Sequence, residues 1–159
     1  STLLASSAAS DVYKRQDDFF HYLKKGAIPP YLPESNAQNG VVIEAFLETA
    51  KRFVRGGYDV YVDGIVGPWF LEPWLRAARE GYEVHYIVLR ASREITLRRA
   101  VERSKLDLKT NTELVKIMWE QFCELGKYEA NVIDTTEQTV SETVQSIKAH
   151  LKSGQNRIK

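Results

Sequence analysis

The sequence predicts an α/β fold built on a parallel sheet. Two short runs of β-branched and aromatic residues, 58–63 and 83–89, have the composition of buried strands. Each run follows a segment in which apolar residues recur every three to four positions, as in a helix with one buried face. Because a helix between two strands returns the chain to the same end of the sheet, this alternation favours parallel strands.

The first two helices have clear ends. One helix is expected over 41–55, and the Gly56-Gly57 pair after it offers the left-handed stop that ends many helices. After the strand 58–63, a second helix is expected over 71–80, closed by Gly81. Both helices precede a strand, as the α/β pattern requires.

The alternation continues in the second half of the chain. Ser92 can cap a helix that runs to about Arg103, and the polar residues 104–111 after it have no clear apolar period. A short strand is expected at 130–134. No repeat or low-complexity stretch interrupts the domain.

Two capping boxes mark the last two helices. Thr110 with Glu113 starts one of them, and Thr139 with Glu142 starts the other. In the final helix, Val144 belongs to a single apolar stripe that faces the core.

Residues 1–16 are expected to be foreign to the rest of the chain. Written as codons, residues 6–16 match a transposase sequencing-library adapter in frame without a mismatch. The alternative is a flexible Ser/Ala-rich tail before a short basic turn. We therefore expect a non-native tail at 1–16, one domain over 17–152 and a disordered tail at 153–159.

Charge and composition argue against several classes of protein. The chain has 22 Lys and Arg against 21 Asp and Glu, and the two counts become equal at 20 each without residues 1–16. This balance argues against a nucleic-acid-binding module, which needs clustered basic charge. No apolar run is long enough to suggest a membrane span. Cys123 is the only cysteine, so no intrachain disulfide can form and a cytoplasmic setting is expected.

Polar residues end each predicted strand or follow it directly. Ligands of open parallel sheets bind at the carboxyl ends of the strands, so these residues are the first candidates for a site. They are Asp63, Arg90, Asp134, Thr135 and Thr136.

Three segments give the chain a resemblance to P-loop small-molecule kinases. They are Asp17-Asp18-Phe19-Phe20-His21, Val60 to Trp69 with its Val-Asp-Gly-Ile-Val-Gly-Pro-Trp run, and Arg99-Ala100-Val101-Glu102-Arg103. The resemblance covers most of Asp17 to Leu151 and is closest to enzymes of the chloramphenicol-phosphotransferase, gluconate-kinase and shikimate-kinase type. It implies a three-layer P-loop NTPase-like parallel sheet that lacks its first strand and its phosphate-binding loop.

The resemblance implies a catalytic acid and a metal-supporting acid. Asp18 would face the acceptor hydroxyl and accept its proton, and Asp63 would hold the water shell of Mg²⁺ or the acceptor. Alternatively, Asp17 or Asp18 caps the helix of Phe19, and Asp63 only forms a turn before Gly64.

Two arginines are the expected nucleotide contacts. The resemblance implies that Arg99 stacks on adenine, that Arg103 reaches the transferring phosphates, and that Thr135 lies beside the adenine. The alternative is that the arginines belong to an ordinary solvated helix face. Substrate contacts are implied for five further residues: Asp17, Phe19, Gln38, Trp69 and Trp119. For Trp69 the alternative is a place in the core, and for Trp119 it is an amphipathic packing helix.

The function expected of the intact parent is an ATP-dependent phosphotransfer to a small-molecule hydroxyl, with ATP and Mg²⁺ as cofactors. The alternative is a non-catalytic nucleotide-binding or small-ligand-binding module. A Gly-x-x-x-x-Gly-Lys-Ser/Thr loop occurs nowhere in the sequence, so the chain as printed is expected to be inactive and marginally folded. The sequence identifies neither the acceptor nor the oligomeric state.

Overall fold

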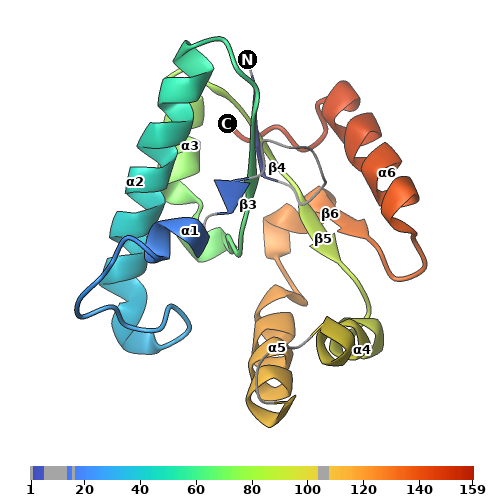
Figure 1. Cartoon of the computed structure of the whole chain (residues 1–159). Helices are drawn as coiled ribbons and strands as arrows, with labels where there is room; N and C mark the ends of the chain where they lie inside the picture. The colour runs from blue at the N-terminus through green and yellow to red at the C-terminus, as the bar shows by residue number, and fades with distance from the viewer. Residues whose placement is uncertain (1, 6–13, 16, 104–107) are drawn as a thin grey trace. The chain divides into compact units, whose positions relative to one another are not determined.

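The computed structural model describes residues 2–5, 14–15, 17–103 and 108–159, and it is mixed α/β with small parallel sheets (Figure 1). The chain forms two compact units, which we call unit 1, Ser1–Tyr86 with Asn156–Lys159, and unit 2, Ile87–Gln155. The predicted alternation of helices and strands is present in both.

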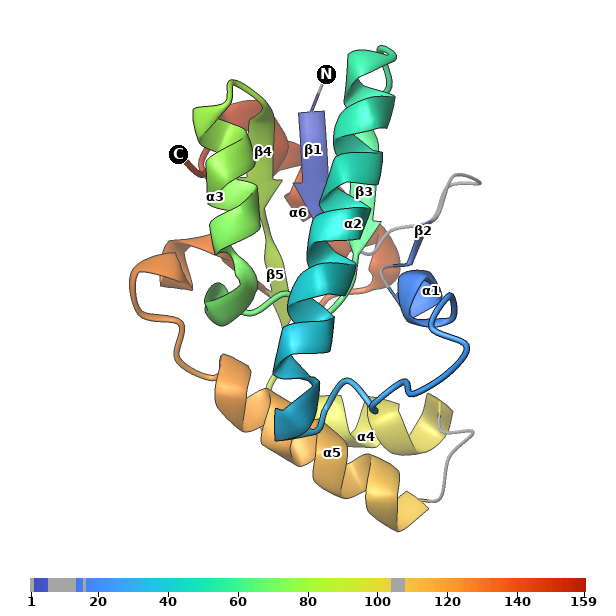
Figure 2. The same ribbon diagram turned by 90° about the vertical axis from the view of Figure 1, so that its left-hand side faces the viewer.

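The described residues of unit 1 form four strands and three α-helices, with two 3₁₀ helices between them. The elements are β1 (Thr2–Ala5), β2 (Lys14–Arg15), α1 (Asp17–Phe20), η1 (Pro33–Ser35), α2 (Asn36–Arg55), β3 (Val60–Asp63), η2 (Pro68–Phe70), α3 (Glu72–Arg79) and β4 (Glu83–Tyr86). The sheet has the order β2-β3-β1-β4 and all its strand pairs are parallel. Figure 2 shows β1 between β3 and β4, with α2 and α3 in front of the sheet.

The expectation that the central strand is missing is wrong for this structure. β1 occupies the place between β3 and β4, where Leu3 is in register with Val60 on one side and with Val84 on the other. A central strand needs backbone N–H and C=O groups and a short apolar run, and the Thr-Leu-Leu-Ala segment supplies both. The foreign origin of residues 1–16 stays a prediction, because sheet pairing does not depend on which gene supplied the residues.

Unit 1 buries its core between the sheet and the helix pair α2–α3. Leu47 and Ala77 are fully buried, and Val62 on β3 is 1 % exposed. Charged pairs hold the two helices together at their rim: Arg76 donates to both carboxylate oxygens of Glu44 at 2.6 Å. These contacts give β3 and β4 a fixed support on this face of the sheet.

The expected strand 83–89 is divided in two. β4 ends at Tyr86, and β5 (Val88–Arg90) begins after Ile87. The sequence run is continuous, but its partners change at Ile87: β4 pairs with β1, whereas β5 pairs with β6 (Val132–Asp134). This change of partner is the boundary between the two units.

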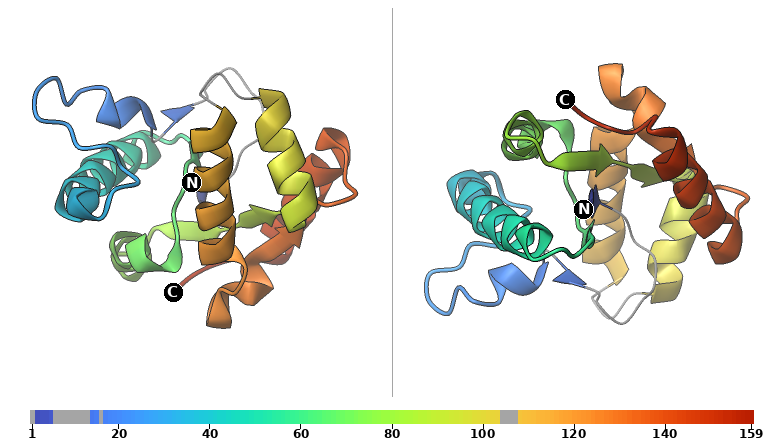
Figure 3. Two further views of the ribbon diagram at one scale, coloured as in Figure 1. Left: turned by 90° about the horizontal axis from the view of Figure 1, so that it is seen from below. Right: turned by 90° about the horizontal axis from the view of Figure 1, so that it is seen from above.

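In the part of unit 2 that the structure describes, a two-stranded parallel sheet is accompanied by three α-helices and one 3₁₀ helix. Its remaining elements are α4 (Arg93–Arg103), α5 (Leu108–Phe122), η3 (Gly126–Asn131) and α6 (Val140–Ser153). A small core of Ile87, Ile133 and Ile147 joins the sheet to α6. The helices α4 and α5 lie side by side (Figure 3).

The capping box of α6 is confirmed, whereas the predicted start of α5 is displaced. Thr139 accepts a hydrogen bond from the backbone N–H of Glu142, whose carboxylate accepts one from the Thr139 backbone in return. By contrast, α5 begins two residues before Thr110, at Leu108.

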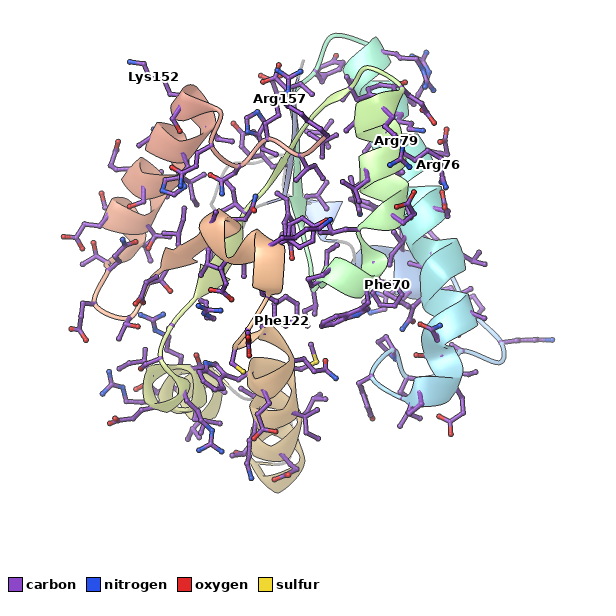
Figure 4. All side chains as sticks on the ribbon, turned by 180° about the vertical axis from the view of Figure 1, so that it is seen from behind. Phe70, Arg76, Arg79, Phe122, Lys152 and Arg157 are labelled. Atoms are coloured by element: carbon purple, nitrogen blue, oxygen red, sulfur yellow. The ribbon has the colours of Figure 1, made fainter. Side chains whose placement is uncertain are left out.

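The C-terminal residues differ from the expectation of a disordered tail at 153–159. The segment 156–158 runs antiparallel along β4, with Tyr86 N–H donating to the carbonyl of Asn156 at 2.9 Å and Ile158 N–H donating to the carbonyl of Val84 at 3.0 Å. Ile158 is 7 % exposed. Figure 4 marks Arg157 in this segment. β4 is an edge strand of its sheet, and its outer backbone groups need hydrogen-bond partners. The C-terminal segment supplies these partners, which explains its regular conformation.

Candidate functional site

The predicted site residues fall into two groups, one in each unit. Unit 1 carries Asp17, Asp18, Phe19, Gln38, Asp63 and Trp69, and unit 2 carries Arg99, Arg103, Trp119 and Thr135.

In unit 1, Asp63 is the last residue of β3 and is half-buried. Its backbone is in register with Arg15 of β2. The strand therefore delivers the Asp63 carboxylate to the carboxyl end of the sheet, as predicted. The magnesium role of Asp63 stays a prediction.

The loop after β3 holds Trp69 at the surface. Val66 is 6 % exposed, and its carbonyl accepts a hydrogen bond of 2.8 Å from the Tyr86 hydroxyl. Leu71, on the other side of Trp69, is 1 % exposed. Between these two anchors, Trp69 is 50 % exposed and lies against Gly67. The sequence suggested Trp69 as a substrate contact, but the packing of Trp69 on Gly67 has no signal in composition or spacing.

Asp17 and Asp18 occupy the first two positions of α1, and their side chains lie outside the described part of the chain. Phe19, which follows them, is in edge-to-face contact with Phe46 of α2, with 4.9 Å between ring centroids. This contact fixes α1 to the core. It gives Phe19 a packing role whether or not it also touches a substrate.

Gln38, an expected substrate contact, lies in the first turn of α2. Its side-chain amide pairs with the backbone of Ile28, accepting from N–H at 2.9 Å and donating to the carbonyl at 2.8 Å. Asn39 likewise donates to the carbonyl of Pro30 at 2.8 Å. These side chains satisfy backbone groups of the Pro-rich segment that precedes α2. In this structure Gln38 holds a loop in place.

In unit 2, the strand ends come together as predicted. Arg90 of β5 is in register with Asp134 of β6, so both stand at the carboxyl edge of the sheet. Arg90, however, is committed to neighbouring groups. Its guanidinium makes two hydrogen bonds to the Glu129 carboxylate, at 3.0 and 2.8 Å, and one of 2.9 Å to the carbonyl of Phe122.

The Arg90–Glu129 pair raises the pKa of Arg90 and lowers that of Glu129. In each case the hydrogen bond between the two side chains is the main cause, and for Glu129 the N–H of Leu125 adds to it. Arg90 thereby fastens the end of α5 to β5. Figure 4 labels Phe122 at this end of the helix. The partner Glu129 was not predicted, because nothing in local spacing connects it with Arg90.

The turn after β6 is held by hydrogen bonds between its own residues. Asp134 accepts two hydrogen bonds from Thr136, 2.5 Å from the hydroxyl and 2.8 Å from N–H, and these lower the pKa of the Asp134 carboxyl. The Thr136 hydroxyl also accepts from the N–H of Ser92 at 2.9 Å. These bonds tie the start of α4 to the end of β6.

Arg99 and Thr135 are brought together. Arg99 donates to the carbonyl of Thr135 at 3.1 Å, and Thr135 is 7 % exposed. Trp119 donates from its indole N–H to the carbonyl of Ala91 at 3.0 Å, which favours a packing role over a substrate contact for Trp119. Arg103 is the last residue of α4, and its side chain lies outside the described part.

Among the described residues, no three His, Cys, Asp or Glu side chains gather into a potential metal centre. None of the helices in that part of the chain is long and apolar enough to cross a membrane.

No protein-family model matches this chain, and no curated protein shows significant sequence similarity to it.

Proposed function

We propose that the intact protein represented by residues 17–152 is an ATP-dependent phosphotransferase acting on the hydroxyl of a small molecule. The observation that carries this proposal is that β3 and β4 run parallel on either side of one central strand, with Asp63 at the carboxyl end of β3. In this structure β1 takes that central place, which a native strand before Asp17 would take in the parent protein. In P-loop kinases, which the sequence resembles, the strand before the phosphate-binding loop lies between the corresponding two strands. We therefore place the acceptor at the carboxyl end of β3.

The proposal assigns the phosphate-binding loop to native residues that precede Asp17 in the parent protein. The printed sequence contains no Gly-x-x-x-x-Gly-Lys-Ser/Thr motif, whose backbone N–H groups, lysine and hydroxyl bind the phosphates and the metal. The printed chain is accordingly proposed to be inactive.

The chain's own residues would share the work of positioning and charge stabilisation. Asp18 would orient the acceptor hydroxyl and accept its proton as the phosphoryl group is transferred. Arg99 and Arg103 would bind the nucleotide, with Thr135 beside the adenine. For this, Arg99 would exchange its hydrogen bond to the Thr135 carbonyl for one to ATP.

Asp63 fits a supporting role toward magnesium. Mg²⁺ keeps several waters and needs only one or two protein carboxylates when substrate phosphates supply the other ligands. Such a site does not require three ligating side chains, so it fits the residues that the structure describes. When bound, the ion would neutralise phosphate charge.

The first test is a long sequencing read through the source DNA upstream of the Asp17 codon, made without transposase library preparation. The proposal requires a strand followed by Gly-x-x-x-x-Gly-Lys-Ser/Thr within roughly thirty residues. The absence of that motif would overturn the kinase proposal.

The second test uses the complete protein. Asp18→Asn should abolish phosphoryl transfer and leave the thermal unfolding midpoint unchanged, because it removes the proton acceptor but little volume. Glu34→Gln, at an exposed acid of η1, is the matched control and should keep full activity. Normal turnover by Asp18→Asn would remove Asp18 from the proposed role. ATP binding without any product in the unmodified protein would instead favour a non-catalytic ligand-binding module.

A further inference from the structure

The C-terminal segment, residues 156–158, pairs with the outer edge of β4 through backbone hydrogen bonds. Tyr86 donates to Asn156, and Ile158 donates to Val84. The pairing is antiparallel. Backbone bonds of this kind can form with any strand that reaches the edge, whichever copy of the chain supplies it.

The side chains of the C-terminal segment also fit this edge. Asn156 is 0 % exposed and Ile158 is 7 % exposed, whereas Arg157 between them is exposed. Such alternation is that of a strand with one buried face. In the register set by the pair of His85 and Arg157, Ile158 lies opposite Val84, which is itself buried. The edge of β4 therefore selects a strand with two buried side chains on either side of an exposed one.

Charge adds to this selection. Arg157, labelled in Figure 4, lies directly opposite His85 in the strand pair. The pKa of Glu83 is lowered mainly by its hydrogen bond of 3.0 Å with His85, and the positive charge of Arg157 lowers it further. A basic residue at the exposed middle position of the segment is thus attracted to β4.

A tight turn comes just before the C-terminal segment. α6 ends at Ser153, and Gly154 after it has φ +70°, a left-handed conformation that residues other than glycine rarely adopt. A Cβ atom placed on Gly154 would meet nothing within 4 Å, so glycine serves the backbone angle and not a close contact. Only Gln155 separates this turn from the segment. In one copy of the chain, the segment therefore reaches β4 by way of a single left-handed residue.

Release of the segment would open the outer edge of β4, and an open strand edge readily pairs with another chain. A second released copy offers this edge a strand of identical sequence. Reciprocal exchange would then restore the same hydrogen bonds and the same buried positions of Asn156 and Ile158. Exchange of an identical element is a low-cost route to a dimer, because only the hinge has to change its conformation.

We propose that the outer edge of β4 binds the C-terminal segment of a second copy of this chain, so that two copies form a dimer by reciprocal exchange about a hinge at Gly154. The dimer is symmetric, since each copy gives and receives the same segment. The closed monomer predominates at low protein concentration, because a segment bound to its own β4 has no cost of association. This interaction is independent of the proposed phosphotransfer.

The first test is an isotope-filtered NMR measurement on the printed chain. Labelled and unlabelled copies are mixed in mild denaturant, which releases the segments, and are returned to buffer at millimolar concentration. We expect nuclear Overhauser contacts between the labelled Tyr86 amide and unlabelled protons of the C-terminal segment. Light scattering should show a dimer whose fraction rises with concentration. A monomer at every concentration, or a dimer without these contacts, would overturn the proposal.

The second test measures binding to the edge of β4 directly. Ile158→Asp removes a buried side chain from the segment and should leave the edge open. We expect this variant to bind the peptide Gln-Asn-Arg-Ile-Lys, residues 155–159, about tenfold or more tightly than the unmodified chain, whose own segment competes. The same peptide with Asp in place of its Ile is the matched control and should not bind. Equal affinity of the two chains for the first peptide would refute the edge as the binding site. If Ile158→Asp does not fold, the NMR measurement decides, because it needs no substitution.

The third test concerns the hinge. Gly154→Val disfavours the left-handed turn of the closed monomer, and the dimer relieves this strain in both copies, so the dimerisation constant should rise about tenfold or more. Gly26→Val is the matched control, because Gly26 has φ +67°, equally open surroundings and a position far from the hinge in sequence. It should lower stability and leave the dimerisation constant unchanged. A constant that does not rise in Gly154→Val, or that rises equally in Gly26→Val, would contradict the exchange.

Discussion

Ile158→Ala is the sharpest test of the C-terminal segment. Ile158 is 7 % exposed beside β4, and its backbone N–H donates to Val84 at 3.0 Å. Truncating a buried isoleucine to alanine typically costs about 2–5 kcal/mol of unfolding free energy. Because Ile158 lies next to the chain end, where the neighbours can relax into the space, we expect the lower limit of about 2 kcal/mol.

Urea unfolding followed by far-ultraviolet circular dichroism measures this cost. With a denaturant dependence of about 2 kcal/mol per molar, typical of a small domain, the midpoint should fall by about 1 M. Ile158→Val should lose only about 0.5–1.5 kcal/mol, and Lys159→Ala, at an exposed residue, should change nothing. A midpoint of Ile158→Ala equal to that of the unmodified chain would show that the segment does not pack on β4.

Two further predictions concern helix ends. Thr139→Ala should lower the stability of α6 by about 1 kcal/mol, measured by thermal unfolding, because it removes the capping hydroxyl. The hydrogen bonds from the Thr139 backbone N–H and hydroxyl lower the pKa of Glu142 in the folded state. The ionised Glu142 therefore stabilises the fold fully above its ordinary pKa, and this contribution is lost as pH falls through the lowered value. Melts between pH 3 and 7 should show this loss in the unmodified chain and less of it in Thr139→Ala; identical curves would contradict the reasoning. Gly57→Ala, at φ +89°, should destabilise the end of α2 by about 1–2 kcal/mol in urea unfolding, and an unchanged midpoint would contradict the left-handed stop.

Local signals predicted most of the helices and strands. The Gly56-Gly57 pair and the Thr139–Glu142 box depend on neighbouring residues only, so the sequence contains the whole of the information. The division of 83–89 depends on which strands pair with each half. The neighbours of Ile87, Tyr86 before it and Val88 after it, are both strand-forming residues, so the change of partner leaves no trace in the sequence.

For the candidate site, the sequence predicted where residues lie along the strands but not which distant residues they contact. Placement of Asp63, Arg90 and Asp134 at strand ends follows from the α/β pattern alone. The hydrogen bond from Arg99 to the Thr135 carbonyl joins residues 36 positions apart, and local sequence spacing cannot predict a contact at that separation. Gly67 belongs to a segment that the sequence singled out, but its contact with the Trp69 ring was not predicted, because glycine is needed there for the close approach of the ring and not for a backbone angle.

The backbone hydrogen bond between Tyr86 and Asn156 has a consequence for how unit 2 is connected to unit 1 along the chain. The chain leaves unit 1 after Tyr86 and returns to it at Asn156, and these two residues are hydrogen-bonded at 2.9 Å. In topological terms, the 69 residues of Ile87–Gln155 are an insertion whose two attachment points are neighbours. Adjacent attachment points let a host domain carry a folded insert at little cost in chain entropy. A short turn could therefore replace the insert, with the C-terminal segment remaining covalently attached beside β4.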